Sequence, residues 1–144
     1  MKIFGHPLHM ILIHFPSALF PMDLICSAIA FTGGASALIH AAYYATLGGA
    51  ALGWLAIITG AVDLVPIVRD KPALISKVLK HGGVNTLVVI GFSAIAMHGF
   101  QHYPEITPDT VFMLSMKAVL VVIMFAGNFI GGSLVLKDRI GTQQ

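Results

Sequence analysis

Residues 110–136 read TVFMLSMKAVLVVIMFAGNFIGGSLVL, and this stretch decides the fold. Lys117 is its only charged residue. About 20 consecutive apolar residues in a helix cross the ~30 Å hydrocarbon core of a bilayer, and this run exceeds that length. It also lacks the period-2 alternation of a half-buried strand and is too long for one. We therefore predict a membrane-spanning helix.

Three further apolar runs precede it, at about residues 8–31, 38–65 and 81–100. The first stops at Thr32-Gly33-Gly34 and the second at Pro66. The chain is 57% hydrophobic and 10% charged, whereas a soluble domain is about 25% charged. We predict one domain over residues 1–144, an all-α bundle of four transmembrane helices in a lipid bilayer, and no nucleic-acid partner.

The basic residues predict the orientation. With four spans, both termini lie on one side of the membrane, and so does the connection between the second and third spans. Cytoplasmic loops carry the excess of Lys and Arg, which predicts that both termini are cytoplasmic. Seven of the eight basic residues lie on that side: Lys2, Arg69, Lys71, Lys77, Lys80, Lys137 and Arg139.

Two ionisable residues of opposite sign lie within the spans at similar depths. Asp23 lies about 12 Å, and Lys117 about 10 Å, from the non-cytoplasmic ends of their helices at 1.5 Å rise per residue. Charges inside a bilayer are costly unless they are paired. We predict an intramembrane ion pair of Asp23 and Lys117, serving either structure or a proton or ligand-charge role.

Histidines gather near the cytoplasmic leaflet. His6, His9 and His14 open the first span, His81 opens the third, and Asp63 closes the second. Asn85 lies one helical turn after His81 and is expected to support it. Three readings remain open: a b-type haem held by histidines of two helices, a non-haem metal bound by His9, His14, His81 and Asp63, or interfacial histidines that bond headgroups and water. For haem, the favoured axial ligands are His14 and His81, with His9 as the substitute if the first helix begins at Pro7.

A second set of histidines lies towards the other leaflet. His40 precedes the second span, and His98 and His102 end the third. His81 and His98 are about 25 Å apart along a helix, so they cannot ligate one metal centre, although they could serve two centres in opposite leaflets. Interfacial roles and a second haem both stay open for this set.

Small residues repeat at intervals of three or four residues on two helices. Such faces let helix backbones approach closely in lipid, or leave room for a flat macrocycle. The stripes are Gly49, Gly53, Ala56 and Gly60 on the second span, and Gly127 and Gly131 on the fourth.

The opening motif, His-Pro-Leu-His-x-x-Leu-x-His-Phe-Pro from His6 to Pro16, resembles the signature of a bacterial family called domain of unknown function 2231. Further similarities are Asp23, Thr59-Gly60-x-x-Asp63, His81 with Asn85, and Gly131-Gly132-x-Leu134-Val135 followed by Arg139-x-Gly141. Met10 departs from the usual motif. The resemblance implies a protein of the bacterial cytoplasmic membrane. It also implies a relation to two-haem membrane cytochromes, and c-type cytochromes as partners.

These observations together predict an electron-transfer subunit that exchanges electrons between haem b and a quinone or a partner redox protein. His9 and Asp63 would support the haem, and His40 with His98 would hold a second one. The alternatives are a non-catalytic membrane anchor of a larger complex and a small metal- or proton-handling protein. Motifs of hydrolytic enzymes are absent from the sequence.

Overall fold

The structure, a computed structural model, describes residues 2–3 and 6–140, and its side chains from Leu8 onward. Two short antiparallel strands come first, β1 (Lys2–Ile3) and β2 (His6–Pro7). The side chain of His6 therefore lies outside the described part. The helices that follow are α1 (Leu8–Leu12), α2 (His14–Phe31), α3 (Ala37–Asp70), the 3₁₀ turn η1 (Pro72–Leu74), α4 (Ile75–His102) and α5 (Val111–Leu136).

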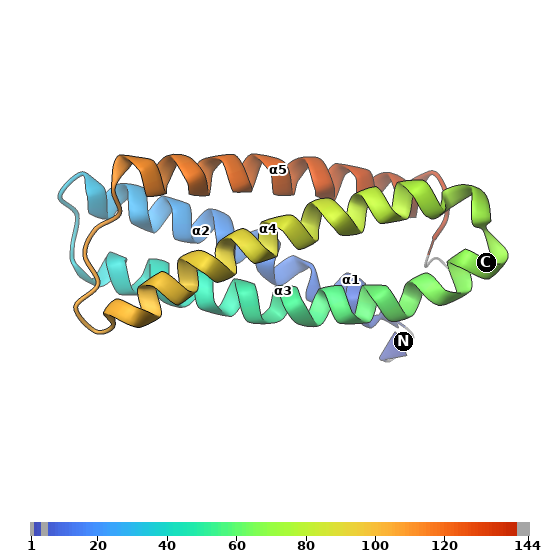
Figure 1. Cartoon of the computed structure of the whole chain (residues 1–144), viewed down its shortest axis with the longest axis horizontal. Helices are drawn as coiled ribbons and strands as arrows, with labels where there is room; N and C mark the ends of the chain where they lie inside the picture. Colours follow the sequence, from blue (N-terminus) through green and yellow to red (C-terminus); the bar gives the residue numbers. More distant parts are fainter. Residues whose placement is uncertain (1, 4–5, 141–144) are drawn as a thin grey trace.

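The long helices form an elongated bundle (Figure 1). Consecutive helices pack against one another, and α2 also contacts α5. One end, the terminal end, carries α1, the α3–α4 connection and the end of α5; the other, the loop end, carries the α2–α3 and α4–α5 loops (Figure 1). Four helical segments in the described residues are long and apolar enough to cross a membrane. The predicted all-α class with four candidate spans is confirmed.

Two helices extend further towards the terminal end than the apolar runs. We expected Pro66 to stop the second span, but α3 continues through it to Asp70. Proline removes one backbone donor and strains the preceding turn, which a long helix tolerates where its other bonds survive. Likewise, α4 begins at Ile75, before the predicted start at His81. The additional turns carry charged residues, so a prediction from hydropathy alone makes both helices too short.

The middle of the bundle is an apolar core centred on two stacked rings. Phe20 and Phe92 are both fully buried, with ring centroids 3.8 Å apart and planes 5° from parallel. A Cβ atom at Gly49 would lie 2.6 Å from the Phe20 ring, and one at Gly53 2.8 Å from Val89. Gly49 and Gly53 therefore allow α3 to pack closely against α2 and α4, as small residues do in membranes.

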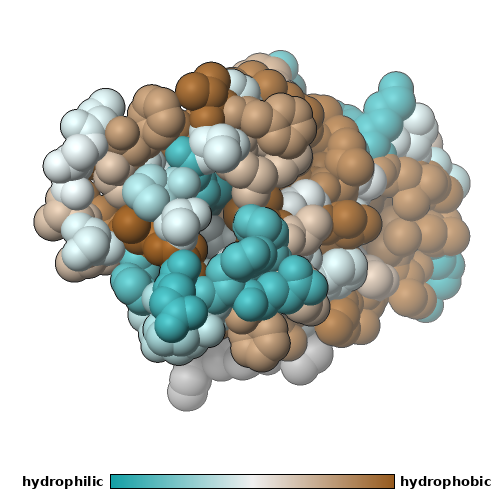
Figure 2. All heavy atoms as spheres, turned by 60° about the vertical axis from the view of Figure 1, so that its left-hand side comes forward, coloured by the Kyte–Doolittle hydropathy of each residue, from teal (hydrophilic) through white to brown (hydrophobic). Residues whose placement is uncertain are grey.

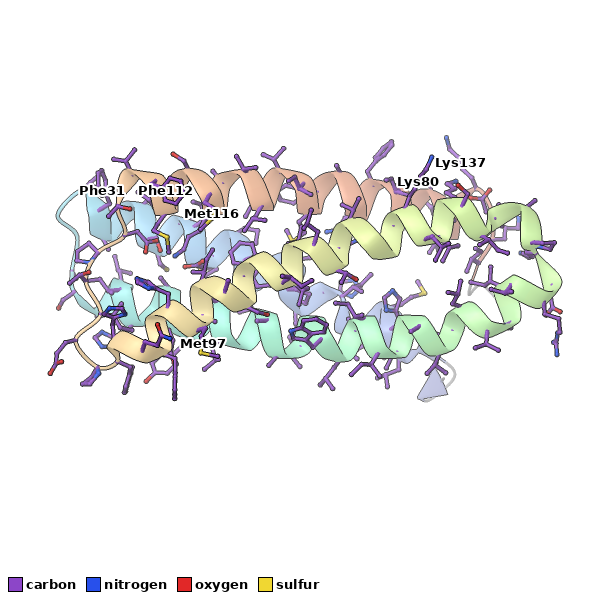
Figure 3. The ribbon with its side chains drawn as sticks, in the orientation of Figure 1. Phe31, Lys80, Met97, Phe112, Met116 and Lys137 are labelled. Atoms are coloured by element: carbon purple, nitrogen blue, oxygen red, sulfur yellow. The ribbon has the colours of Figure 1, made fainter. Side chains whose placement is uncertain are left out.

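The outer surface of the bundle is apolar. Exposed hydrophobic side chains occur on all four long helices, and Phe129 is 79% exposed. Hydrophilic residues gather at the loop end, in front of the hydrophobic sides of the helices (Figure 2). Lys80 and Lys137 lie together at the terminal end, whereas Phe31 and Phe112 lie at the loop end (Figure 3). An apolar surface of this kind suits a bilayer. Lys80 and Lys137 belong to the set of basic residues at the terminal end from which we predict the orientation.

Candidate functional site

His9 lies on the short helix α1, which begins immediately after Pro7. Proline at the start of a helix is favoured because its missing N–H would have no partner there. α1 packs against α3, and Nδ1 of His9 lies 2.7 Å from the carbonyl oxygen of Ala56 on that helix. A carbonyl oxygen only accepts, so Nδ1 carries the proton and donates it. The other ring nitrogen, Nε2, is left with its lone pair.

His81 on α4 repeats this arrangement against a different helix. Its Nδ1 lies 2.9 Å from the carbonyl oxygen of Gly127 on α5. Asn85, one turn on, donates to the backbone oxygen of His81 at 2.9 Å. The Asn85 amide nitrogen also lies 3.2 Å from Nδ1 of His81, but this is not a second hydrogen bond, because Nδ1 is already a donor. Here too Nε2 keeps its lone pair.

The two imidazoles face each other across the bundle. Their ring centroids are 6.4 Å apart and their planes are 85° from parallel. They come from α1 and α4, each of which is anchored to a different neighbouring helix. Both rings are half-buried. The pair therefore brings two imidazoles together with both Nδ1–H groups already hydrogen-bonded to backbone oxygens.

Glycines lie behind both rings. A Cβ atom at Gly60 would lie 2.9 Å from Cε1 and Nδ1 of His9. One at Gly131 would lie 2.5 Å from Cε1 of His81. Real Cβ contacts this short do not occur, so the rings require glycine at both positions. Gly60 on α3 and Gly131 on α5 thus make room for a histidine ring rather than for another helix.

A cavity of about 930 Å³ adjoins the histidine pair, and its lining is mainly apolar. Ligand pockets typically measure about 300–1,000 Å³. Asp70, Lys71 and Arg139 line the part of it formed by the end of α3 and the segment after α5. Every candidate residue predicted near this leaflet and described with its side chain lines it: His9, His14, Asp63, His81 and Asn85.

His14 takes a different position from His9. The helix is interrupted at Ile13 between α1 and α2, since Pro16 supplies no N–H to the carbonyl of Leu12, although the backbone of Ile13 itself keeps α-helical dihedral angles. Even in an unbroken helix, residues five apart point about 140° from each other. His14 is exposed, and the ring found against His81 is that of His9, the substitute ligand for a helix starting near Pro7. In the described residues, no three His, Cys, Asp or Glu side chains gather as a metal site would require.

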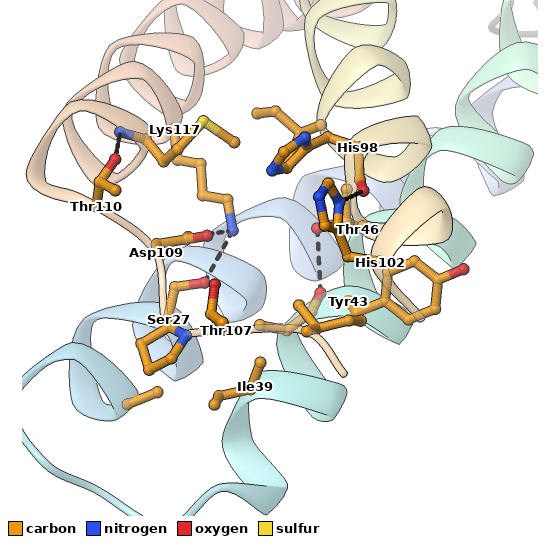
Figure 4. A pocket seen from close by; sticks show the side chains of 17 residues that line it. Ser27, Ile39, Tyr43, Thr46, His98, His102, Thr107, Asp109, Thr110 and Lys117 are labelled. Carbon is orange, nitrogen blue, oxygen red and sulfur yellow. Dashed lines mark hydrogen bonds and ion pairs between the residues drawn. The ribbon is translucent and has the colours of Figure 1, made fainter. Parts of the chain in front are cut away.

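The predicted ion pair is present nearer the loop end. Nζ of Lys117 lies 2.7 Å from Oδ1 of Asp23, and both residues are buried. Lys117 also donates to Ser27 at 2.8 Å and lies 2.6 Å from Oδ2 of Asp109 (Figure 4). The sequence analysis missed Asp109, which lies just before α5. Its position two residues before the start of a helix that carries a buried lysine is the signal that would have found it.

The loop-end histidines do not form a second facing pair. Nε2 of His40 lies 3.0 Å from the carbonyl oxygen of Pro104. His98 and His102 lie on one face of α4, with ring centroids 4.5 Å apart, and line a pocket of about 140 Å³. This volume is well below that of pockets that enclose organic cofactors. His40 contacts the loop that follows α4, whereas His98 and His102 contact each other on one helix.

Comparison with known protein families gives a match over nearly the whole chain. The model of a family described as predicted membrane protein (DUF2231) matches residues 5–144. Neither a curated protein nor a solved structure matches the chain.

Proposed function

We propose that this chain, which belongs to the DUF2231 family of predicted membrane proteins, is a membrane-embedded electron-transfer subunit holding one b-type haem between His9 and His81. The observation that carries the proposal is the facing pair of imidazoles. His81 is retained from the predicted ligands, and His9 takes the place of His14.

The separation of the two rings fits a shared iron. Two imidazole nitrogens bound at about 2 Å to one ion from opposite sides place their ring centroids roughly 6.2 Å apart. The rings of His9 and His81 are 6.4 Å apart. The spacing is compatible with bis-histidine ligation.

The hydrogen bonds of the two rings point to the same role. A histidine that ligates a metal almost always donates its other ring N–H to a carbonyl or carboxylate, which fixes the tautomer and the ring orientation. Nδ1 of His9 donates to Ala56 and Nδ1 of His81 to Gly127. Each ring therefore offers Nε2 as the ligand atom.

The cavity beside the pair suits a large flat cofactor with acidic substituents. Its volume of about 930 Å³ and its apolar lining match an organic ring system. Lys71 and Arg139 in its lining would pair with carboxylate groups, and Asp63 and Asn85 would supply polar contacts. A haem bound there supplies reversible one-electron transfer, and the protein tunes its potential through ligand identity, burial and hydrogen bonds.

The electron partners follow from the membrane setting. A quinone dissolved in the lipid or a c-type cytochrome at the surface would exchange electrons with the site. With the predicted orientation, the histidine pair lies near the cytoplasmic leaflet of the bacterial cytoplasmic membrane. We do not include a second haem at His40 and His98, since the pocket beside His98 has a volume of only about 140 Å³.

The test is the haem content of purified wild type and three single variants in mild detergent, by pyridine haemochrome and dithionite-reduced spectra. We expect His9→Ala and His81→Ala to lose haem by about tenfold or more, because even the loss of a group that only orients a metal ligand costs about 10- to 100-fold in affinity. His14→Ala is the matched control and should keep it, because His14 is exposed. A colourless wild type that copurifies with larger partners would refute the proposal in favour of a membrane anchor.

A further inference from the structure

Lys117 lies between two carboxylates inside the bundle. Its ammonium contacts Oδ1 of Asp23 at 2.7 Å and Oδ2 of Asp109 at 2.6 Å. Asp23 is fully buried, Lys117 is 3% exposed, and the side chain of Asp109 is 19% exposed. With all three groups ionised, the cluster carries one unbalanced negative charge.

The neighbouring groups do not balance this charge. Ser27 on α2 accepts from Lys117 and donates to Asp23 at 3.2 Å. Tyr43 and Thr46 on α3 and His98 and His102 on α4 line the adjoining pocket. Both histidines are exposed, and Lys117 is the only Lys or Arg among the described lining residues. An unpaired buried charge is expensive, so a buried group usually neutralises instead.

Two carboxylate oxygens of the cluster are buried without a hydrogen-bond partner, Oδ2 of Asp23 and Oδ2 of Asp109. The second lies 2.6 Å from Nζ of Lys117, so the first is better suited to carry a proton. Oδ1 of Asp23 accepts from both Lys117 and Ser27, while Oδ2 is buried without a hydrogen-bond partner. Thr46 lies beside this carboxylate, and its hydroxyl donates to the carbonyl oxygen of Ala42 at 3.0 Å. The Thr46 oxygen is therefore left as an acceptor. A proton on Oδ2 of Asp23 would give this buried oxygen a hydrogen to donate to an acceptor of this kind.

We propose that Asp23, Asp109 and Lys117 form a proton-binding site that holds one proton and exchanges it with the loop end of the bundle. Exchange runs through Asp109, which together with Lys117 lines the pocket of about 140 Å³ next to the exposed His98 and His102 (Figure 4). Asp23 stores the proton and Asp109 connects it to solvent. The proposal is independent of the haem.

The experiment is infrared spectroscopy of the purified protein at neutral pH, which separates protonated carboxylic acids from carboxylates by their C=O stretch. Wild type should show the band of one protonated carboxyl per chain, and the band should shift in D₂O. Asp23→Asn removes the group that carries the proton. Asp109→Asn should also abolish the band, because a single carboxylate facing Lys117 is balanced and ionises.

Asp70→Asn is the matched control and should keep the band, since Asp70 is exposed and pairs with Arg69. If Asp23→Asn does not fold, Asp109→Asn decides alone, with a thermal melt to show that it is folded. A wild type without the band, or a band retained in Asp109→Asn, would overturn the proposal. So would a band that disappears when Na⁺ replaces K⁺ at fixed pH, which would indicate a metal cation instead.

Discussion

Replacing Gly131 by alanine tests the histidine site without touching a ligand. The new Cβ atom would lie 2.5 Å from Cε1 of His81, whereas ordinary contacts begin at 3.4 Å, so the ring must move by about 0.9 Å. The neighbour behind the clash is a ring hydrogen-bonded to Gly127, not the loose end of a flexible side chain. Metal–ligand distances tolerate about 0.2 Å, and functional geometry about 0.5 Å. Gly131→Ala should therefore lose haem while the helix persists.

Gly83→Ala on α4 is the control, because a Cβ atom added at this exposed helical glycine would meet nothing within 4 Å and Gly83 is not among the residues that line the histidine cavity. Both changes favour the helix by about 1 kcal/mol, so a general loss of stability cannot explain a difference between them. The assay is haem per protein after purification, with a thermal melt of each apoprotein. Equal haem content in the two variants would refute the assignment of His81 as a ligand positioned by Gly131.

Further predictions concern the core, the charge cluster and the orientation. Lys117→Met should destabilise the protein by about 3–5 kcal/mol, because it leaves two carboxylates without their cation. The control Lys137→Met, at an exposed position, should change the free energy of unfolding by about 0.5 kcal/mol or less. Phe20→Ala should lower the free energy of unfolding by about 3–5 kcal/mol, because it leaves a cavity beside Phe92. Phe129→Ala should lower it far less, because Phe129 is exposed. Unfolding in detergent measures these two variants and the two lysine variants. Lys137→Cys should react with an impermeant thiol reagent only in inside-out vesicles and Glu105→Cys only in intact cells, and the reverse pattern would contradict the predicted orientation.

The fold was predictable because the bilayer imposes a simple rule on composition. Runs of about 20 apolar residues form helices, since no water is present to satisfy a freed backbone. The same rule fails at helix ends where the composition turns polar. There α3 continues past Pro66 and α4 starts at Ile75, because backbone bonding rather than hydropathy decides where a helix ends.

The site was predictable only in part because its geometry depends on one break in the chain. Depth along the spans correctly placed His9, His14 and His81 towards one end of the bundle. Which of the first two faces His81 depends on the break at Ile13 and on Gly60, where a Cβ would collide with His9. Spacing shows that His9 and His14 point about 140° apart, but it does not show which of them packs against His81. Asp23 and Lys117 were paired correctly by depth because each lies inside one continuous helix, where the rise per residue gives the depth.

The apolar core has a consequence for how the two proposed sites can act together. The histidine pair lies towards the terminal end and the Asp23 cluster towards the loop end, with the stacked Phe20 and Phe92 between them. Phe20 lines the histidine cavity, and Asp23 comes one turn later on the same helix. Proton transfer needs a chain of polar groups or water, and two fully buried phenylalanines interrupt it. Sites this far apart without shared partners behave additively, so Asp109→Asn should leave haem content unchanged and His81→Ala should leave the carboxylic acid band unchanged.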